Sequence, residues 1–325
     1  MKKTVLIFLV VALLFAGASC STQTEKVQEK ETVRVLALKG PTGIGMAKLM
    51  AENDAENGAN DYDFTIFAQP TEVAAEVIAG RFDIAAVPAN LAATLYNKTS
   101  GGVKVAAVNT LGVLYILENG NTVNSIGDLK GKTIGATGQG AVPEYVLNYL
   151  LSENGLVPGV DVNIEYYDEH TELAAQLASG TVKIGMLPQP NVTSAMAKNA
   201  DLRVAVDINE VWNGLDTGSG LTQGCIIVSK DFAENHSEAL EAFLKEYRAS
   251  AEFAVSNVAE TAEICAEKEI IPSKELAEKA IPLCNICYID GTEMKEKLAG
   301  FLEVLYNADS KSVGGKLPGE DFYFG

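Results

Sequence analysis

The chain is poor in the residues that most often carry catalysis or hold metal ions. Its 325 residues include two histidines, one tryptophan and five cysteines. His170 and His236 lie far apart and lack the spacing of a metal site. GPTGIGMAK resembles a phosphate-binding loop, but Met46 follows Gly45 where a lysine should stand, and no G-x-S-x-G sequence occurs. We therefore expect no enzyme, no bound metal and no cofactor.

Positive charge and long apolar runs are also scarce. The chain has 25 Lys and Arg against 43 Asp and Glu, a formal net charge of −18. Binding to nucleic acid requires basic side chains opposite the phosphates, so we expect no nucleic-acid partner. The longest apolar run, Val5 to Phe15, follows Lys2 and Lys3 and precedes small residues. It is too short for an ordinary spanning helix and is typical of a secretory signal over residues 1–20.

Two processing outcomes fit this signal. Ala16-Gly17-Ala18 is a small-residue cleavage site, whereas Gly17 to Cys20 resembles the lipobox of bacterial lipoproteins, with Gly where Leu is usual. We favour lipidation of Cys20, followed by a flexible polar tether over residues 21–32. The protein would then be extracytoplasmic, either anchored to the outer face of the bacterial cytoplasmic membrane or periplasmic.

Four cysteines remain, and the sequence does not pair them. They are Cys225, Cys265, Cys284 and Cys287. Four cysteines allow three pairings. Cys284 and Cys287 have redox-motif spacing, but no helix follows them as it would in a thioredoxin-like site. Buried thiols are the default expectation, and one disulfide is the alternative.

An internal repeat organises the chain. TEVAAEVIAGRFDIAAVP (Thr71 to Pro88) aligns without a gap with TELAAQLASGTVKIGMLP (Thr171 to Pro188), with seven of eighteen positions identical. Each copy indicates a helix followed by a buried strand. Strands and helices also alternate around both copies, which predicts a mainly parallel sheet covered on both faces.

The fold class that follows is α/β with two βα-sandwich lobes. We expect lobe 1 over residues 33–112 and 231–325, and lobe 2 over residues 113–230. Beyond Ser229 the pattern predicts only helices, which pack back onto lobe 1. Two crossing strands, near residues 111–117 and 223–229, would then form a hinge. Trp212 falls in a stretch, residues 209–220, that we expect to be irregular.

This arrangement predicts a ligand cleft between the lobes. In open α/β sheets, ligands bind beyond the carboxyl ends of the strands, where loops enter helix N-termini. Pro88 and Pro188 each end a strand and expose the following backbone. The predicted loops are residues 39–43, 69–72, 88–90, 137–142, 168–171 and 188–191. Their amides and helix dipoles suit an anionic or strongly polar ligand.

Several segments, taken together, resemble a known family. They are the signal with its cysteine, ALKGPTGIGMAKLM, NTLGVLYILENG, GCIIVSKDFAENHSEALEAFLKEY and SIGDLKGKTIGATGQGAVPEYVLNYLL, which contains the recognisable DLKGKTIG. The chain is similar to type II periplasmic substrate-binding proteins, in the group serving importers of nitrate, sulfonates, taurine and thiamine-precursor pyrimidines. The resemblance implies a bilobal binding-protein fold and capture of a small molecule. It also implies delivery to an ABC permease and ATPase by a monomeric, lipid-anchored protein.

Candidate ligand contacts come from the predicted loops and hinge, and the turn at 138–140 also from the resemblance. They are Lys39, Gly40, Thr42, Gln69, Pro88, Asn90, Asn109, Thr110, Gly138, Gln139, Gly140, His170 and Pro188. One plausible cation, Lys39, among mostly neutral donors favours a neutral or singly charged ligand, such as a sulfonate, a taurine-like or a pyrimidine-like molecule. The alternatives are an enzyme on the same bilobal fold, against which the signal counts, and a surface ligand sensor.

Overall fold

Two β-sheets, each covered by helices, make up the part of the chain that the structure describes. The structure is a computed structural model and describes residues 30–215 and 219–325. The predicted signal, Cys20 and most of the predicted tether lie outside the described residues. No helix in the described part is long and apolar enough to cross a membrane.

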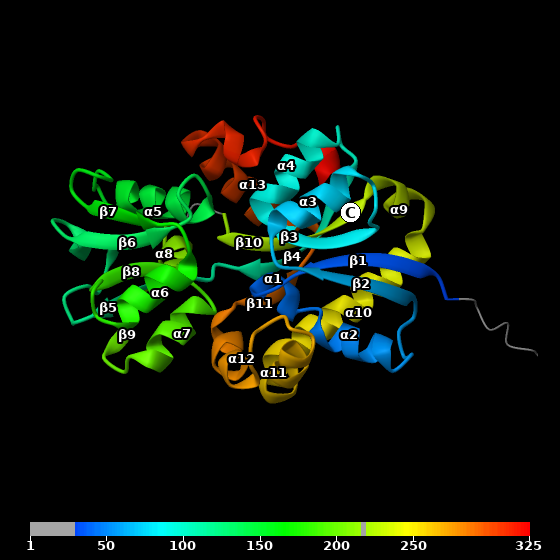
Figure 1. Ribbon diagram of the computed structural model, residues 1–325. Coiled ribbons are helices and arrows are strands. Elements are labelled where there is room, and N and C mark those ends of the chain that lie inside the picture. Colours follow the sequence, from blue (N-terminus) through cyan, green and yellow to red (C-terminus); the bar gives the residue numbers. More distant parts are fainter. Residues whose placement is uncertain (1–29, 216–218) are drawn as a thin grey trace, which may run out of the picture. The chain divides into compact units, whose positions relative to one another are not determined.

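The first sheet has six strands in the order β11-β4-β10-β3-β1-β2 (Figure 1). β1 pairs in parallel with β2 and β3, whereas β10 is antiparallel to both β3 and β4. The strand bounds are β1 (Thr32–Leu38), β2 (Asp61–Phe67), β3 (Ile84–Pro88), β4 (Val103–Leu111), β10 (Thr222–Ser229) and β11 (Ile286–Ile289).

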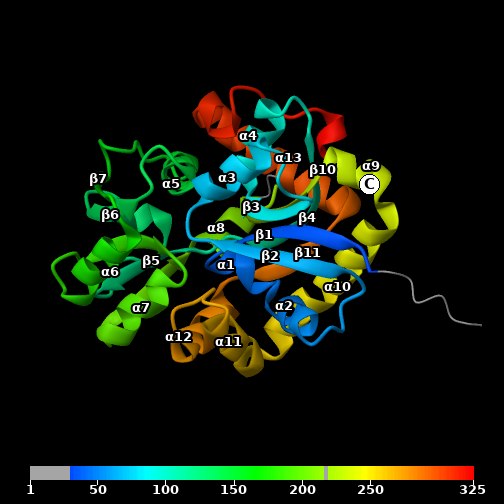
Figure 2. The same cartoon turned by 45° about the vertical axis from the view of Figure 1, so that its right-hand side comes forward.

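Side chains on these strands alternate between two apolar layers, because successive residues of a strand point to opposite faces. Ala85 and Val87 pack with α3, α4 and α13, whereas Ile84 and Ala86 pack with α2, α10, α11 and α12. Figures 1 and 2 show these two sets of helices on opposite faces of the sheet. The helices of this lobe are α1 (Pro41–Ile44), α2 (Ala47–Asp54), α3 (Pro70–Ile78), α4 (Ala89–Lys98), α9 (Lys230–Asn235), α10 (Ser237–Ser256), α11 (Val258–Glu267), α12 (Lys274–Ala280) and α13 (Gly291–Ala308).

The second sheet has five strands in the order β7-β6-β8-β5-β9. β6 is parallel to β7 and β8, and β5 is antiparallel to β8 and β9. Its strands are β5 (Leu114–Asn119), β6 (Thr133–Thr137), β7 (Asn163–Tyr167), β8 (Ile184–Pro188) and β9 (Leu202–Asp207). Its helices are α5 (Val142–Glu153), α6 (His170–Ala178), α7 (Asn191–Lys198) and α8 (Ile208–Asn213). The predicted α/β fold with two lobes is confirmed.

The chain passes between the sheets at two neighbouring places. The first passage is Gly112–Val113, between β4 and β5, and the second follows α8 and leads into β10. The Gly112 N–H donates to Asn209 Oδ1 at 3.3 Å, and its carbonyl accepts from Asn285 Nδ2 at 2.6 Å. A Cβ on Gly112 would lie 2.5 Å from Leu221, so the two passages touch. The lobe boundaries themselves stay a prediction, but β10, which the boundary at 230 gave to lobe 2, belongs to the first sheet.

Two local expectations change. Beyond Ser229 the chain is not all helical, because Ile286–Ile289 forms β11 against the edge strand β4; this short apolar segment is rich in β-branched and aromatic residues. Trp212 lies in helix α8 and is fully buried. The default expectation for the cysteines holds, because Cys225, Cys265, Cys284 and Cys287 are free thiols, of which all but the half-buried Cys287 are buried. Burial raises the pKa of Cys265 to about 12.

Candidate functional site

The two copies of the sequence repeat fold into matching units, one in each lobe. The first copy gives α3 and β3, and the second gives α6 and β8. A glycine with positive φ follows each helix, Gly80 at 70° and Gly180 at 75°. Pro88 and Pro188 end their strands, and each is paired with a crossing strand, Pro88 opposite Gly224 and Pro188 opposite Leu114.

A cavity of about 410 Å³ lies where these units meet. This volume is within the range of small-molecule sites. Both lobes contribute to its wall. Four of its residues are predicted ligand contacts, namely Pro88, Asn90, His170 and Pro188. The others are Pro70, Thr71, Ala74, Leu91, Lys98, Leu114, Ala141, Val142, Pro143 and Gln223.

The lining is mostly apolar with a few polar groups. Lys98 carries the only formal positive charge among the described residues that line the cavity, and none of them is Asp or Glu. Lys98 was not predicted, because it lies in the last turn of α4, away from the loops. Gln223 was also missed, although its strand was expected at the hinge. Together they favour a ligand with an apolar body and at most one or two negative charges.

Three helices with no side-chain cap present the N-terminal end of their dipole to this cavity. They are α4, α5 and α6, whose N-cap residues are Pro88, Ala141 and Glu169, so backbone N–H groups of their first turns are left for other acceptors. At α7 the situation differs, since Gln189 Oε1 accepts from the Thr193 N–H at 3.4 Å as well as from the Thr193 hydroxyl at 2.8 Å. Free amides at a helix N-terminus are a ready site for an anionic group.

His170 enters the cavity as a neutral group. Its Nδ1 lies 2.7 Å from the Thr137 hydroxyl at the end of β6, which fixes the ring. Burial lowers the pKa of His170, against a smaller opposing effect of Glu169. At neutral pH the imidazole therefore supplies hydrogen bonding rather than charge.

Three other predicted contacts lie at the hinge, outside the cavity. Asn109 Nδ2 donates to the Thr42 carbonyl at 3.1 Å, and Asn109 Oδ1 accepts from the Thr110 hydroxyl at 3.1 Å. Asn109 and Thr110 are buried. The first bond joins β4 to α1 and the second lies within β4, so the three residues have a structural role.

Lys39, Gly40 and Gln69 have partners outside the cavity. The ammonium of Lys39 lies 3.3 Å from Glu269 Oε2, and both side chains are exposed. Gly40 N–H donates to the Ile270 carbonyl, and Gln69 N–H donates to Glu72 in a capping box. None of these three lines the cavity, nor do Gly138 and Gln139.

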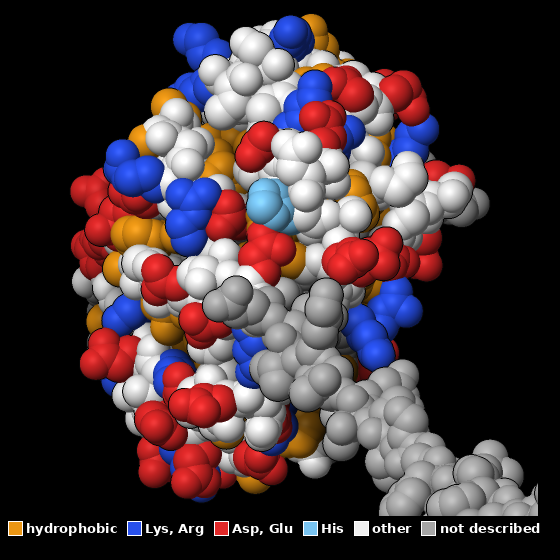
Figure 3. Space-filling view, turned by 90° about the vertical axis from the view of Figure 1, so that its right-hand side faces the viewer, with side chains coloured by type: hydrophobic (Ala, Val, Ile, Leu, Met, Phe, Trp, Pro, Cys, Tyr) orange, Lys and Arg blue, Asp and Glu red, His pale blue; other side chains and the backbone are white. Residues whose placement is uncertain are grey.

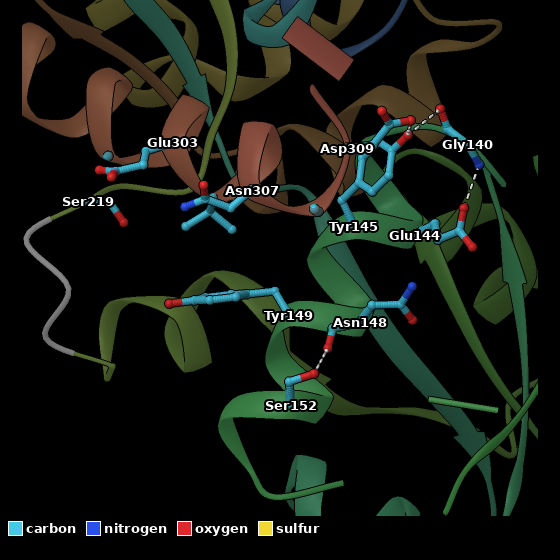
Figure 4. Close-up of a pocket in the computed structure, with 13 residues that line it drawn as sticks. Gly140, Glu144, Tyr145, Asn148, Tyr149, Ser152, Ser219, Glu303, Asn307 and Asp309 are labelled. Carbon is cyan, nitrogen blue, oxygen red and sulfur yellow. Dashed lines mark hydrogen bonds between the residues drawn. The ribbon is translucent and has the colours of Figure 1, made fainter. Parts of the chain in front are cut away.

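Gly140, the last predicted contact, lines a second and larger cavity. This cavity measures about 790 Å³ and lies between α5 and α13 (Figure 4). The Gly140 N–H donates to Glu144 Oε2 at 2.6 Å, so this amide is already used. Tyr145 hydroxyl donates to the Gly140 carbonyl at 3.1 Å and lies 3.3 Å from Asp309 Oδ2, across the lobes.

The surface carries charges of both signs. On the face shown in Figure 3, acidic side chains are spread widely, with basic ones among them. No group of His, Cys, Asp and Glu among the described residues could hold a metal ion.

The sequence matches a family of transport proteins. Residues 46–266 match the family described as ABC transporter, phosphonate, periplasmic substrate-binding protein. The match spans more than half of the 325 residues, and the chain belongs to this family. Its members are substrate-binding proteins of ABC transporters, which is in keeping with a non-enzymatic, extracytoplasmic role. No match was found among curated proteins.

Solved structures show the same fold. An ABC transporter protein from Parabacteroides distasonis is 26% identical with a TM-score of 0.77, over 91% of this chain and 99% of that one. The periplasmic aliphatic sulphonate binding protein SsuA from Escherichia coli is 15% identical with a TM-score of 0.69, covering 89% and 92%. The alkanesulfonate-binding protein SsuA from Xanthomonas axonopodis pv. citri, bound to MOPS, is 16% identical with a TM-score of 0.63, covering 90% and 96%. The fold is thus the bilobal one of periplasmic binding proteins, as the sequence resemblance implied.

Proposed function

We propose that the protein captures a small organic molecule with one anionic group and a compact apolar body, and delivers it to an ABC permease and its ATPase. Sulfonates, taurine-like molecules and phosphonates have this chemistry, and a pyrimidine-like ligand is the neutral alternative. The binding site is the 410 Å³ cavity. The observation that carries the proposal is that both repeat copies contribute a strand-ending proline to this one cavity.

The chemistry of the lining supports this ligand class. The anionic group lies at the uncapped first turns of α4 and α5, and Lys98 supplies a positive charge to the wall of the same cavity. The apolar body contacts the prolines, Leu91 and Val142. Asn90 is held in place by its bond to the Ser312 carbonyl at 3.4 Å, and it offers a neutral polar contact together with His170.

A thermal-shift screen tests the proposal. The panel holds alkylsulfonates, taurine, alkylphosphonates, nitrate, bicarbonate and aminomethyl-pyrimidines. A ligand at about one hundred times its dissociation constant adds about 2.7 kcal/mol of stability, which raises the melting temperature by roughly 5 °C. One responding class supports the proposal, and recovery of the unchanged ligand after incubation separates binding from turnover. A silent panel, with no small molecule released on denaturation, would contradict it.

We further propose that lipidation of Cys20 holds the protein at the membrane surface. The motif Gly17 to Cys20 supports this. A C20S substitution is expected to move the protein from the membrane fraction to the soluble fraction, because the acylated thiol is lost. If cleavage follows Ala18 instead, wild type and C20S will fractionate alike.

A further inference from the structure

The larger cavity forms a groove with a chemistry opposite to that of the ligand cleft. We call it the α5–α13 groove, because one face of α5 and one face of α13 form most of its wall. Its carboxylates are Glu144, Glu303 and Asp309, and no Lys or Arg is among the described residues that line it. An anionic ligand is therefore disfavoured in this groove.

The carboxylates are spread along the groove rather than gathered at one point. Figure 4 shows Glu303 at one end, and Asp309 with Glu144 at the other. Since no cluster of three potential metal ligands occurs among the described residues, a single metal ion does not fit this arrangement. Separated negative charges suit an elongated cation with charge at more than one place.

The three carboxylates differ in how many hydrogen bonds they already make. Asp309 accepts from the Lys311 amide at 2.9 Å and lies 3.3 Å from the Tyr145 hydroxyl, and Glu144 accepts from Gly140. Glu303 is exposed and makes no hydrogen bond or ion pair with the other described residues. Glu303 is thus the carboxylate most open to a new partner.

An aromatic ring and a buried acceptor complete the lining. The Tyr149 ring packs on Trp212, with ring centroids 5.0 Å apart, and lies across the groove from Asn307 and Ser219 (Figure 4). A ring held in this way can receive a cation on its open face. Asn148 Oδ1 is buried without a hydrogen-bond partner in the described part of the chain, and it would accept from an N–H donor.

We propose that the α5–α13 groove is a second binding site, which takes an aliphatic diammonium or polyammonium ion. Such a cation has an apolar chain for Tyr149 and Val304, and ammonium groups for Glu303 at one end and Asp309 at the other. Its N–H groups also supply the donor that Asn148 Oδ1 lacks. Because the groove takes residues from both lobes, the bound cation contacts both.

Calorimetric titration of the protein with 1,4-diaminobutane at low salt tests this proposal. The experiment compares wild type with E303Q and Y149L, and uses E241Q as the matched control. Glu241 is an exposed carboxylate on α10 outside the groove, so E241Q removes the same charge elsewhere. Magnesium chloride at the same ionic strength controls for general attraction of cations to an acidic protein.

We expect saturable binding of one diamine per chain, and weaker binding of magnesium. E303Q should weaken diamine binding about tenfold, since it removes a charged partner. Y149L should weaken it about threefold, and E241Q less than twofold. The proposal is overturned by an absence of saturable binding, by magnesium binding as tightly as the diamine, or by E241Q weakening binding as much as E303Q. Because Glu303 is exposed, E303Q should fold, which circular dichroism verifies.

Discussion

The two lobes share a strand order but assemble it from different parts of the chain. The order β2-β1-β3-β10-β4 in the first sheet corresponds to β7-β6-β8-β5-β9 in the second. The antiparallel strand of the second sheet, β5, immediately precedes the parallel ones in sequence, whereas β10 returns after the whole second lobe. The two sheets therefore reach the same strand order by different chain paths. In each sheet the strand that ends in proline pairs with an antiparallel strand, β3 with β10 and β8 with β5.

The lobes differ more at the cleft than in their framework. Helices α3 and α6 begin one hundred positions apart, as do β3 and β8. After Pro88, helix α4 begins at once and its first turn has no side-chain cap. After Pro188, the side chain of the buried Gln189 accepts from the Thr193 N–H in the first turn of α7. The repeat therefore specifies the helix and strand of each wall, whereas the residues that follow each proline differ in the hydrogen-bonding groups they leave free.

If the two repeat copies are equivalent, the largest losses of stability are expected at the matched core positions Val77 and Leu177. Both side chains are almost fully buried, in α3 and α6. We expect L177A to lower the free energy of unfolding by about 3 kcal/mol and V77A by about 2 kcal/mol, since both leave cavities. Denaturant unfolding measures both. I78A is the control, because Ile78 is 52% exposed and should change stability by less than about 0.5 kcal/mol.

A smaller and more equal effect is expected at the glycines that end these helices. Gly80 and Gly180 have φ of 70° and 75°, a region in which a Cβ is disfavoured. A Cβ on Gly80 would meet no atom within 4 Å, and on Gly180 nothing closer than 3.5 Å. G80A and G180A should therefore each cost about 1 kcal/mol from backbone strain alone. Unequal losses in thermal unfolding would show that the two turns are not equivalent.

The smallest expected effect is a pH dependence of stability that arises in the second lobe alone. His170 occupies the position that corresponds to Pro70, so this titration belongs to the second copy alone. Burial lowers the pKa of His170, so the unfolded chain takes up a proton first. Wild type should lose stability relative to H170N as pH falls below about 6.5, and the loss should level off below the lowered pKa. The carboxylate contributions are common to both proteins, so parallel stability curves would contradict the assignment.

Local patterns were sufficient to predict the walls of the cleft. The period of the repeat, the alternating strands and the two prolines depend on neighbouring residues, and the helices and strands follow them within a few positions. β11 was missed because a four-residue strand becomes recognisable only when it pairs with β4, far away in sequence.

The side chains within the cleft were less predictable. Lys39 follows a strand, but Glu269, 230 positions later, pairs with it on the surface. Lys98 lines the cavity because of how helix α4 packs in the fold. Gln223 lines it because β10 pairs with β3 and β4. Such long-range placements are not encoded in local spacing, whereas Asn90 and His170 stand directly at helix starts, and both line the cavity.

The most direct test of the account compares the two cavities. The ligand that responds in the thermal-shift screen should be titrated into wild type, N90A, H170A and E303Q. Asn90 and His170 line the smaller cavity from opposite lobes, and Glu303 lines the α5–α13 groove. We predict that N90A and H170A each weaken binding about tenfold, while E303Q leaves it unchanged. A loss of affinity in E303Q, with N90A and H170A unaffected, would contradict the claim that the two repeat copies build the ligand site.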